Sequence, residues 1–249
     1  MKRFSINLGD LYKDSFIYGI AEFLQKAISF FLLPVYTRYL LPEDYGVLAL
    51  LMIISTIFPA IASLGLPNAI FREVSLKSKN KDEVFCVGFV AMFISSFLLV
   101  LICLSFSKII IQGLVGSVDN EYIHLIKITI ITSFFVCLHT IPKLFFRAQR
   151  RAKLTSVLNL IHVLISISIS IVLVVYYDLK LYGVVYANLS STIISTILNF
   201  IIVFKFIKIR FDFSFLKRML SYGLPIVPSR VQGFGMLYFG QYMINNNYL

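Results

Sequence analysis

Six long apolar stretches follow one another along the 249-residue chain. A helix needs about 20 predominantly apolar residues to cross a hydrocarbon core of roughly 30 Å. We place the spans near residues 15–40, 45–66, 84–107, 122–146, 154–177 and 182–206, with a seventh beginning near residue 221. A transmembrane barrel would instead show segments of about ten residues in which apolar and polar positions alternate. The sequence therefore predicts an all-α polytopic membrane protein.

The composition agrees with insertion into a membrane. Hydrophobic residues make up 59% of the chain and charged residues 14%, whereas soluble domains average about half apolar and a quarter charged residues. These values exclude an ordinary water-soluble domain. The three cysteines, Cys86, Cys103 and Cys137, lack the paired spacing of a zinc site or a disulfide framework. No metal site and no cofactor are expected.

Basic residues are distributed unevenly between the spans, and this asymmetry sets the orientation. Lys and Arg near the ends of spans are held on the cytoplasmic side. With the amino terminus inside, 17 of the 23 basic residues fall in cytoplasmic segments and four fall outside. We therefore expect a cytoplasmic amino terminus. The formal net charge of +11 lies in these short loops, so contact with anionic membrane lipids accounts for it better than binding of nucleic acid.

A weak internal repeat suggests a second lobe. A shift of 204 residues aligns Lys13 with Lys217, Tyr18 with Tyr222, Gly19 with Gly223 and Lys26 with Arg230. The aligned segments are the first and seventh spans, as a six-helix repeat requires, and secondary transporters often bind substrate between such repeats. The end of the sequence at Asn245–Leu249 indicates either a truncated second lobe, which we favour, or a lone seventh helix with a short tail. The expected parts are a cytoplasmic amino terminus (1–14), a six-helix transmembrane lobe (15–206), a basic cytoplasmic loop (207–220) and the start of a second lobe (221–249).

The first span carries a polar face inside the membrane. Its members recur at spacings of three and four and so share one side of a helix: Ser15, Gly19, Glu22, Gln25, Lys26 and Ser29. A lysine near the middle of a span costs about 2.5–3.5 kcal/mol on insertion scales, and a nearby carboxylate offsets only part of that. We expect Lys26, with Glu22 and Gln25, to present positive charge to an anionic substrate, and Arg230 to face it from the seventh span. The alternative is an ion pair that only packs the bundle.

Asn159 and His162 are candidate cavity residues on the fifth span. They belong to a stripe of polar residues spaced by three or four. Polar residues in membrane helices most often form interhelical hydrogen bonds, and packing is the simpler interpretation. An intramembrane histidine can also carry a proton, which is the sharper interpretation.

A dense basic cluster lies at the inner end of the fourth span. It comprises Lys143, Arg147, Gln149, Arg150 and Arg151. Topology alone accounts for the cluster. In the sharper interpretation Arg147, Arg150 and Arg151 bind phosphate-bearing headgroups at the cytoplasmic mouth, because arginine matches phosphate oxygens in a bidentate way.

Enzyme motifs are absent from the sequence. The chain has no Gly-x-Ser-x-Gly, no Gly-x-x-x-x-Gly-Lys, no His-Glu-x-x-His and no Cys-x-x-Cys. The acidic pairs Glu43–Asp44 and Asp82–Glu83 lie in expected loops. No catalytic residues are expected, and a transporter is favoured over an enzyme.

Several segments of the chain together resemble a known family. These are Tyr18–Gly19 through Pro34, Thr37–Leu40, Pro42–Gly46, Gly65–Arg72, Phe146–Arg150 and Ser221–Pro228. They resemble Wzx-type polysaccharide flippases, of the MATE-like flippase superfamily, over essentially the whole chain. The resemblance implies two six-helix lobes in full-length members and alternating access between them.

The same resemblance implies a function. Wzx-type flippases move undecaprenyl-diphosphate-linked oligosaccharide repeat units across the bacterial inner membrane for O-antigen or capsule synthesis. Lys26 and Arg230 are the positions that match the family's cationic cavity residues. The implied partners are the lipid-linked oligosaccharide, membrane lipids, and a polysaccharide polymerase or ligase of the same pathway. Two alternatives stay open: a MATE-like drug or cation antiporter, and a truncated membrane protein that does not transport.

Overall fold

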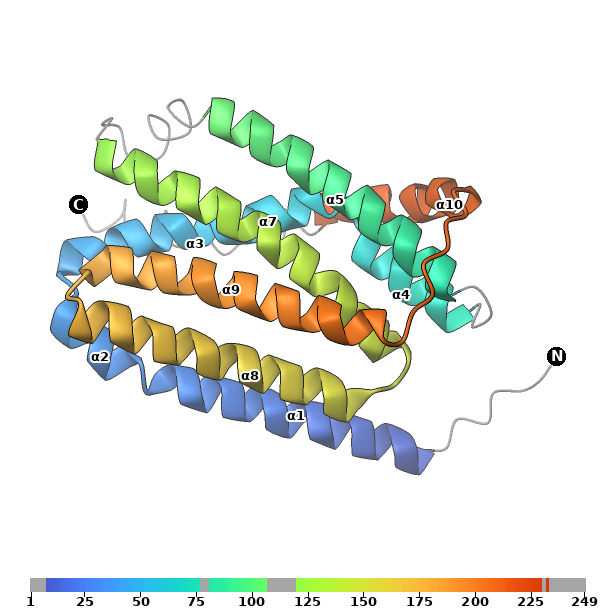
Figure 1. Ribbon diagram of the computed structural model, residues 1–249, viewed down its shortest axis with the longest axis horizontal. Helices are drawn as coiled ribbons and strands as arrows, with labels where there is room; N and C mark the ends of the chain where they lie inside the picture. The colour runs from blue at the N-terminus through green and yellow to red at the C-terminus, as the bar shows by residue number, and fades with distance from the viewer. Residues whose placement is uncertain (1–7, 77–80, 107–119, 230–231, 233–249) are drawn as a thin grey trace.

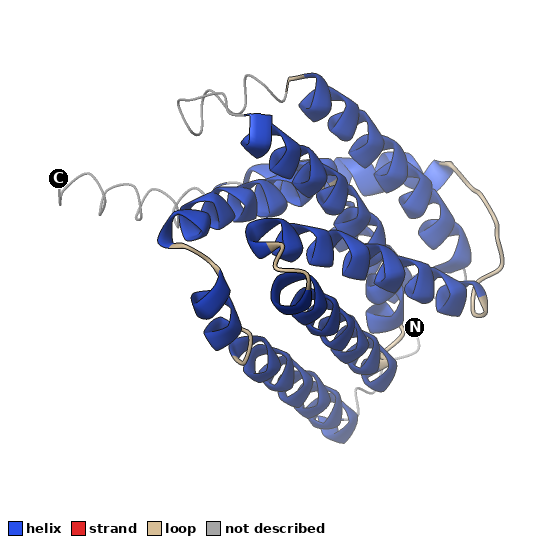
Figure 2. Ribbon diagram, turned by 60° about the vertical axis from the view of Figure 1, so that its left-hand side comes forward, coloured by secondary structure: helices blue, strands red, loops and turns tan. Residues whose placement is uncertain are grey.

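The computed structural model describes residues 8–76, 81–106, 120–229 and 232, and every regular element within them is helical (Figure 1, Figure 2). The helices are α1 (Leu8–Phe30), α2 (Leu33–Tyr39), α3 (Pro42–Ala62), α4 (Leu66–Leu76), α5 (Lys81–Ser105), α7 (Asn120–Ala148), α8 (Ala152–Ile171), α9 (Lys180–Phe204) and α10 (Ser214–Gly223). The α8 helix continues as a π-helix, η2 (Val172–Tyr176), and α10 continues as a 3-10 turn, η3 (Leu224–Ile226).

The described residues contain six segments that are helical, long and apolar enough to cross a membrane. They are Ser15–Tyr39, Asp44–Ala62, Lys81–Ser105, Tyr122–Ala148, Ala152–Tyr176 and Lys180–Phe204. Each coincides, to within a few residues, with one of the six spans expected from the sequence. The all-α, six-span architecture is therefore confirmed. The expected seventh span, which begins near residue 221, lies largely outside the described residues.

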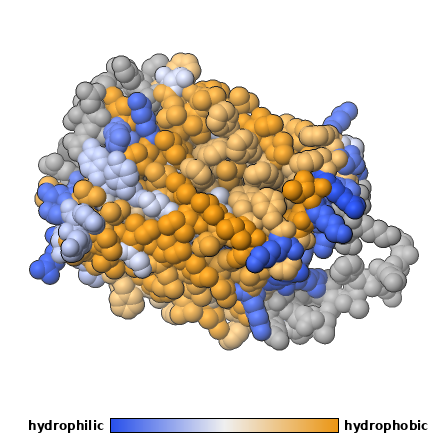
Figure 3. Space-filling view, in the orientation of Figure 1, coloured by the Kyte–Doolittle hydropathy of each residue, from blue (hydrophilic) through white to orange (hydrophobic). Residues whose placement is uncertain are grey.

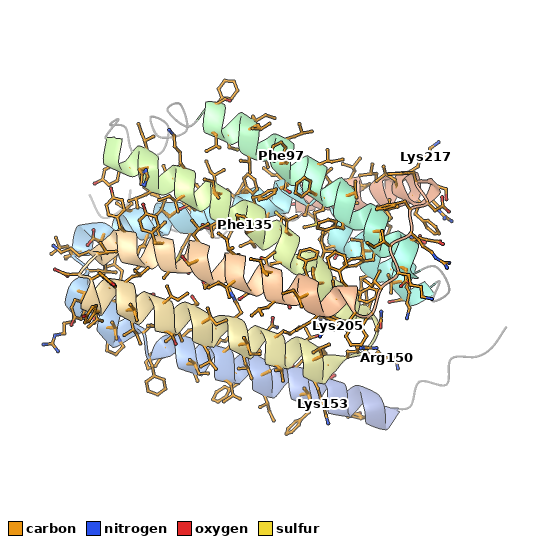
Figure 4. All side chains as sticks on the ribbon, in the orientation of Figure 1. Phe97, Phe135, Arg150, Lys153, Lys205 and Lys217 are labelled. Atoms are coloured by element: carbon orange, nitrogen blue, oxygen red, sulfur yellow. The ribbon has the colours of Figure 1, made fainter. Side chains whose placement is uncertain are left out.

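The surface has the distribution that a bilayer requires. Hydrophobic residues cover the middle of the face shown in Figure 3, and hydrophilic residues gather towards its two ends. Arg150, Lys153, Lys205 and Lys217 all lie towards one end of the bundle in Figure 4, whereas Phe97 and Phe135 lie between the ends. The apolar helices are thus aligned so that their basic ends coincide.

The helices are arranged around α7 and α9. The α8 helix lies between α1 and α9, and α9 lies between α8 and α7 (Figure 1). On its other side α7 packs against α3 and α5. Aromatic rings join these helices: Phe85 and Phe145 meet edge to face at 5.1 Å, and Phe89 and Phe200 do so at 5.0 Å. Such pairs add about 0.5–1.5 kcal/mol beyond the area that they bury.

The first span is broken near its carboxyl-terminal end. Between α1 and α2 the chain makes a turn at Phe31 and Leu32, and Pro34 stands in the first turn of α2. Proline lacks a backbone N–H and fits the first turn of a helix, where that donor has no intrahelical partner. The α2 helix is fixed to α8 by a hydrogen bond of 2.8 Å between Tyr36 Oη and Ser170 Oγ.

Replacing Tyr36 with Phe is expected to destabilise the lobe by about 1 kcal/mol. The change removes the Tyr36–Ser170 hydrogen bond while keeping the ring, and interhelical hydrogen bonds in membranes contribute on average about 0.6 and at most about 1.7 kcal/mol. Detergent-induced unfolding followed by circular dichroism measures the loss. Tyr12→Phe is the matched control, since the Tyr12 side chain is exposed; equal stability of the two variants would contradict the assignment.

Two helices lie where the sequence suggested connecting segments. The α4 helix occupies part of the break after the second span, and α10 occupies residues 214–220 of the expected basic loop. The basic segment expected over 207–220 contains this helix from residue 214 onward, because Phe215, Met219 and Gly223 recur every four residues and bury one face of α10. Its start is fixed by Asp212, whose Oδ1 accepts the Ser214 N–H at 2.9 Å.

The α10 helix packs against α4 and α5, and its last residue makes a close backbone contact with the turn before α4. Gly65, just before α4, has φ +66°, and a Cβ there would overlap the carbonyl oxygen of Gly223. A Cβ on Gly223 would in turn lie 2.6 Å from the Leu64 carbonyl oxygen. Beside this contact the Arg72 guanidinium lies 4.5 Å from the centre of the Tyr222 ring. These contacts tie residues 214–223 to the lobe.

Candidate functional site

A cavity of about 750 Å³ opens between α1, α7 and α8. Its wall contains both polar and charged side chains at the depth of the candidate spans. The lining residues are Ser15, Tyr18, Gly19, Ala21, Glu22 and Gln25 of α1, Thr140, Lys143, Leu144 and Arg147 of α7, and Thr155, Ser156 and Asn159 of α8. We call this space the α1–α7–α8 cavity.

The α1 wall is the polar face expected from the sequence. Residues 15, 18, 19, 22 and 25 recur at spacings of three and four and therefore face one side. Gln25 Nε2 donates a hydrogen bond to the Ala21 carbonyl at 3.1 Å. A Cβ on Gly19 would meet no atom within 4 Å. Helix packing therefore does not require a glycine at this position of the cavity wall.

The α7 wall supplies the positive charge. Lys143 and Arg147 stand one helical turn apart and both line the cavity. The Arg147 guanidinium also lies 5.8 Å from the centre of the Tyr18 ring on the opposite wall. Against these two cations the lining residues include a single carboxylate, Glu22. The cavity therefore carries a net positive charge and suits an anion.

The α8 wall contains two buried polar atoms that lack a hydrogen-bond partner among the described residues. Ser156 Oγ and Asn159 Oδ1 are shielded from solvent and have no hydrogen-bond partner among the described residues. A buried polar group left unsatisfied costs about 1–3 kcal/mol, so a bound ligand or water that reaches these atoms is stabilised. Thr155 Oγ1 is already engaged, donating to the Arg151 carbonyl at 3.1 Å.

Lys26 lies at the rim of the cavity rather than in its wall. Its Nζ is 3.1 Å from Glu22 Oε1, and the two side chains are 77% and 69% exposed. Glu22 thus belongs both to the cavity wall and to this ion pair. An exposed ion pair in the middle of a span cannot face lipid tails without a large penalty. This side of α1 therefore requires water or another polypeptide in front of it.

His162, Arg150 and Arg151 lie apart from the cavity lining. His162 is half-buried between α8 and α9, with Nδ1 2.8 Å from Ser195 Oγ. Arg150 is exposed in the turn between α7 and α8, where its φ is +57°, and Arg151 places its guanidinium 4.1 Å from the Phe206 ring centre. Arg230 lies outside the described residues. The structure thus brings Glu22, Gln25, Arg147 and Asn159 together around one cavity.

Sequence reasoning assigned Lys143 to the cytoplasmic basic cluster and did not single out His139. Both lie on α7, four residues apart, and Arg147 follows after four more. This spacing was a readable signal of one helical face. It was hidden because topology already accounts for basic residues at the end of a span.

Solved structures of transporters share this fold. A crystal structure of MATE in the straight conformation gives a TM-score of 0.77 at 15% identity, covering 95% of this chain and 56% of that one. An outward-facing multidrug resistance MATE family transporter of the MOP superfamily gives 0.71 at 16%, covering 89% and 52%. A MOP superfamily transporter from Pyrococcus furiosus, described as having a binding pocket of reverse polarity that suggests a different function, gives 0.69 at 15%, covering 89% and 52%. This chain spans about half the length of these proteins.

The sequence itself identifies the family. No curated protein matches the chain significantly. The family described as Polysaccharide biosynthesis protein matches over residues 11–247, which is almost the whole chain. The six candidate spans and the MATE-like fold agree with a transporter-like membrane protein. The chain is therefore a multi-pass membrane protein that belongs to the polysaccharide biosynthesis protein family.

Proposed function

We propose that this chain forms one six-helix lobe of a flippase that moves undecaprenyl-diphosphate-linked oligosaccharide repeat units across the bacterial inner membrane. The observation that carries the proposal is the α1–α7–α8 cavity, in which Lys143 and Arg147 face a single carboxylate. The diphosphate is the anionic part of such a lipid, and arginine binds phosphate oxygens through two parallel N–H groups. The family match supports a role in polysaccharide synthesis.

The size of the cavity fits the linkage region of this substrate. Small-molecule sites range over about 300–1,000 Å³, and about 750 Å³ holds a diphosphate with its first sugar. Longer glycans would extend past the rim at Lys26, where an exposed ion pair calls for an aqueous path. We assign Lys26 and Glu22 to this path and Asn159 to the ligand. The opposing wall would come from a second lobe beginning near residue 221, with Arg230 in it.

The orientation follows from the basic end of the bundle. Lysine and arginine near span ends stay on the cytoplasmic side, and the cavity lies between α1 and the ends of α7 and α8 that adjoin Arg150. We therefore place the cavity mouth and the amino terminus in the cytoplasm. Arg150 and Arg151 then lie near lipid headgroups, where anionic lipid is attracted.

The proposed function is tested by a binding competition. The full chain in lipid nanodiscs is titrated with undecaprenyl-diphosphate-linked N-acetylglucosamine, with undecaprenol, and with tetraphenylphosphonium. We expect the diphosphate lipid to bind at least about tenfold more tightly than undecaprenol, because each charge-assisted hydrogen bond contributes about 1.5–3 kcal/mol. Tetraphenylphosphonium should not displace it. Tight binding of the cation with none of the diphosphate lipid would instead support a drug or cation antiporter.

A further inference from the structure

Two histidines from neighbouring helices meet in the interior of the lobe. The ring centroids of His139 on α7 and His162 on α8 are 5.0 Å apart. The His139 side chain is 5% exposed, and its Nε2 is shielded from solvent without a hydrogen-bond partner among the described residues. His162 Nδ1 lies 2.8 Å from Ser195 Oγ of α9. The pair therefore holds one ring nitrogen that is buried and unsatisfied.

The histidine pair adjoins the α1–α7–α8 cavity. Lys143 follows His139 by one helical turn, and Asn159 precedes His162 by about one turn. Both Lys143 and Asn159 line the cavity. The two rings thus lie next to the lining of the α1–α7–α8 cavity. Lys143 lies beside both the cavity and the rings.

The charge of Lys143 connects the cavity with the histidine pair. Lys143 stands one helical turn from His139 on α7 and lines the cavity, and the His162 ring lies 5.0 Å from that of His139. Inside a protein, like charges at short range repel far more strongly than in water. A proton on either ring is therefore opposed by Lys143, and an anion bound to Lys143 offsets that repulsion.

Other charged groups lie on the elements packed around the pair. They include Glu22 on α1, Asp44 on α3, Glu73 on α4, Asp82 on α5 and Arg147 on α7. Glu22 and Arg147 line the same cavity. Asp44 accepts the Leu41 backbone N–H at 2.8 Å, and Asp82 accepts the Lys208 backbone N–H at 3.3 Å. From α9, Ser195 and the backbone of Ser191 interact with His162.

We propose that His139 and His162 form one buried proton site whose occupancy is coupled, through Lys143, to binding of an anionic ligand in the α1–α7–α8 cavity. Binding of the ligand draws one proton from solution onto the pair, and a protonated pair strengthens binding of the ligand to the same extent, because linkage between two sites is reciprocal. The identity of the ligand as a diphosphate lipid rests on the proposed function. The proton site and its coupling to Lys143 do not.

The first test measures ligand affinity against pH. Undecaprenyl-diphosphate-linked N-acetylglucosamine is a diester of diphosphoric acid, so its own ionisation does not change between about pH 5.5 and 8. Uptake of one proton makes the affinity of the full chain rise by up to about tenfold per pH unit as the pH falls. His139→Gln and His162→Gln should each flatten this dependence. His124→Gln, on the exposed His124 of the same helix, should leave it unchanged.

The second test needs no ligand. The chain has three histidines, so ring signals of protein labelled with ¹³C-histidine can be assigned with the three single variants. In Lys143→Gln the pH dependence of the His139 and His162 ring signals should differ from that in the unaltered protein, because the neighbouring charge is gone. The His124 signal should not move. If His139→Gln does not fold, as judged by size-exclusion chromatography, His162→Gln alone supplies the comparison.

The outcomes separate the two proposals. Tight binding that does not vary with pH overturns the coupling and leaves the proposed function standing. No binding of the diphosphate lipid contradicts the proposed function, and the ring signals then decide the proton site. If the ring signals of His139 and His162 have the same pH dependence in the Lys143→Gln variant as in the unaltered protein, the proton site coupled to Lys143 is overturned.

Discussion

Lys143→Gln should weaken binding of undecaprenyl-diphosphate-linked N-acetylglucosamine by roughly 10- to 150-fold. Lys143 is one of two cations in the wall of the α1–α7–α8 cavity, and a hydrogen bond to a charged group contributes about 1.5–3 kcal/mol. Arg147→Gln should have an effect of the same order. The double variant should fall short of the product of the two, because neighbouring cations that share one diphosphate are not independent. Titration in nanodiscs measures all three.

The matched control is Lys153→Gln. Lys153 is an exposed lysine at the start of α8, at the same end of the bundle but outside the cavity lining (Figure 4). The same change of charge there should alter affinity by less than about threefold, since exposed charges are screened by salt and water. Equal losses in Lys143→Gln and Lys153→Gln would show that general surface charge, and not the cavity, attracts the lipid.

Gly65→Ala should destabilise the folded lobe by about 2–5 kcal/mol. Gly65 has a left-handed backbone, which costs an L-residue about 1–2 kcal/mol. The added Cβ would also overlap the Gly223 carbonyl, and overpacking a well-filled site costs typically about 1–3 kcal/mol. Unfolding by a denaturing detergent, followed by circular dichroism, measures the loss of stability.

Gly46→Ala controls for the substitution itself. A Cβ on Gly46, within α3, would meet no atom within 4 Å, and alanine favours a helix over glycine by up to about 1 kcal/mol. This variant should be as stable as the unaltered protein or slightly more stable. If Gly65→Ala were as stable as Gly46→Ala, that result would contradict the close backbone contact between residues 65 and 223.

The sequence predicted the spans well because their signal is local. An uninterrupted run of about twenty apolar residues is typical of a helix that crosses a membrane, and the six candidate spans follow from that alone. The α10 helix was missed because five basic residues between Lys205 and Arg218 dominated the interpretation of the segment. Its apolar residues are few, and they acquire meaning only when α4 and α5 are present to cover Phe215 and Met219.

The candidate site was predictable in part for the same reason. The polar face of α1 is a property of one helix, so its members Glu22 and Gln25 could be found by spacing. The contact between His139 and His162 joins residues 23 positions apart on two helices, and nothing in either helix alone specifies it. Lys26 was expected beside Glu22 on this face, and the two side chains form an ion pair, although only Glu22 lines the α1–α7–α8 cavity.

The contact between Gly65 and Gly223 also restricts how the chain can move. With α10 fastened to α4 and α5, residues up to 223 travel with the six-span lobe as one body. Any swing of the following chain relative to that body must start at or after η3, where Pro225 interrupts the α-helical pattern. The hinge for such a motion is thereby confined to the few residues that follow Gly223. The backbone contact at Gly65 holds the chain in place on the other side of that hinge.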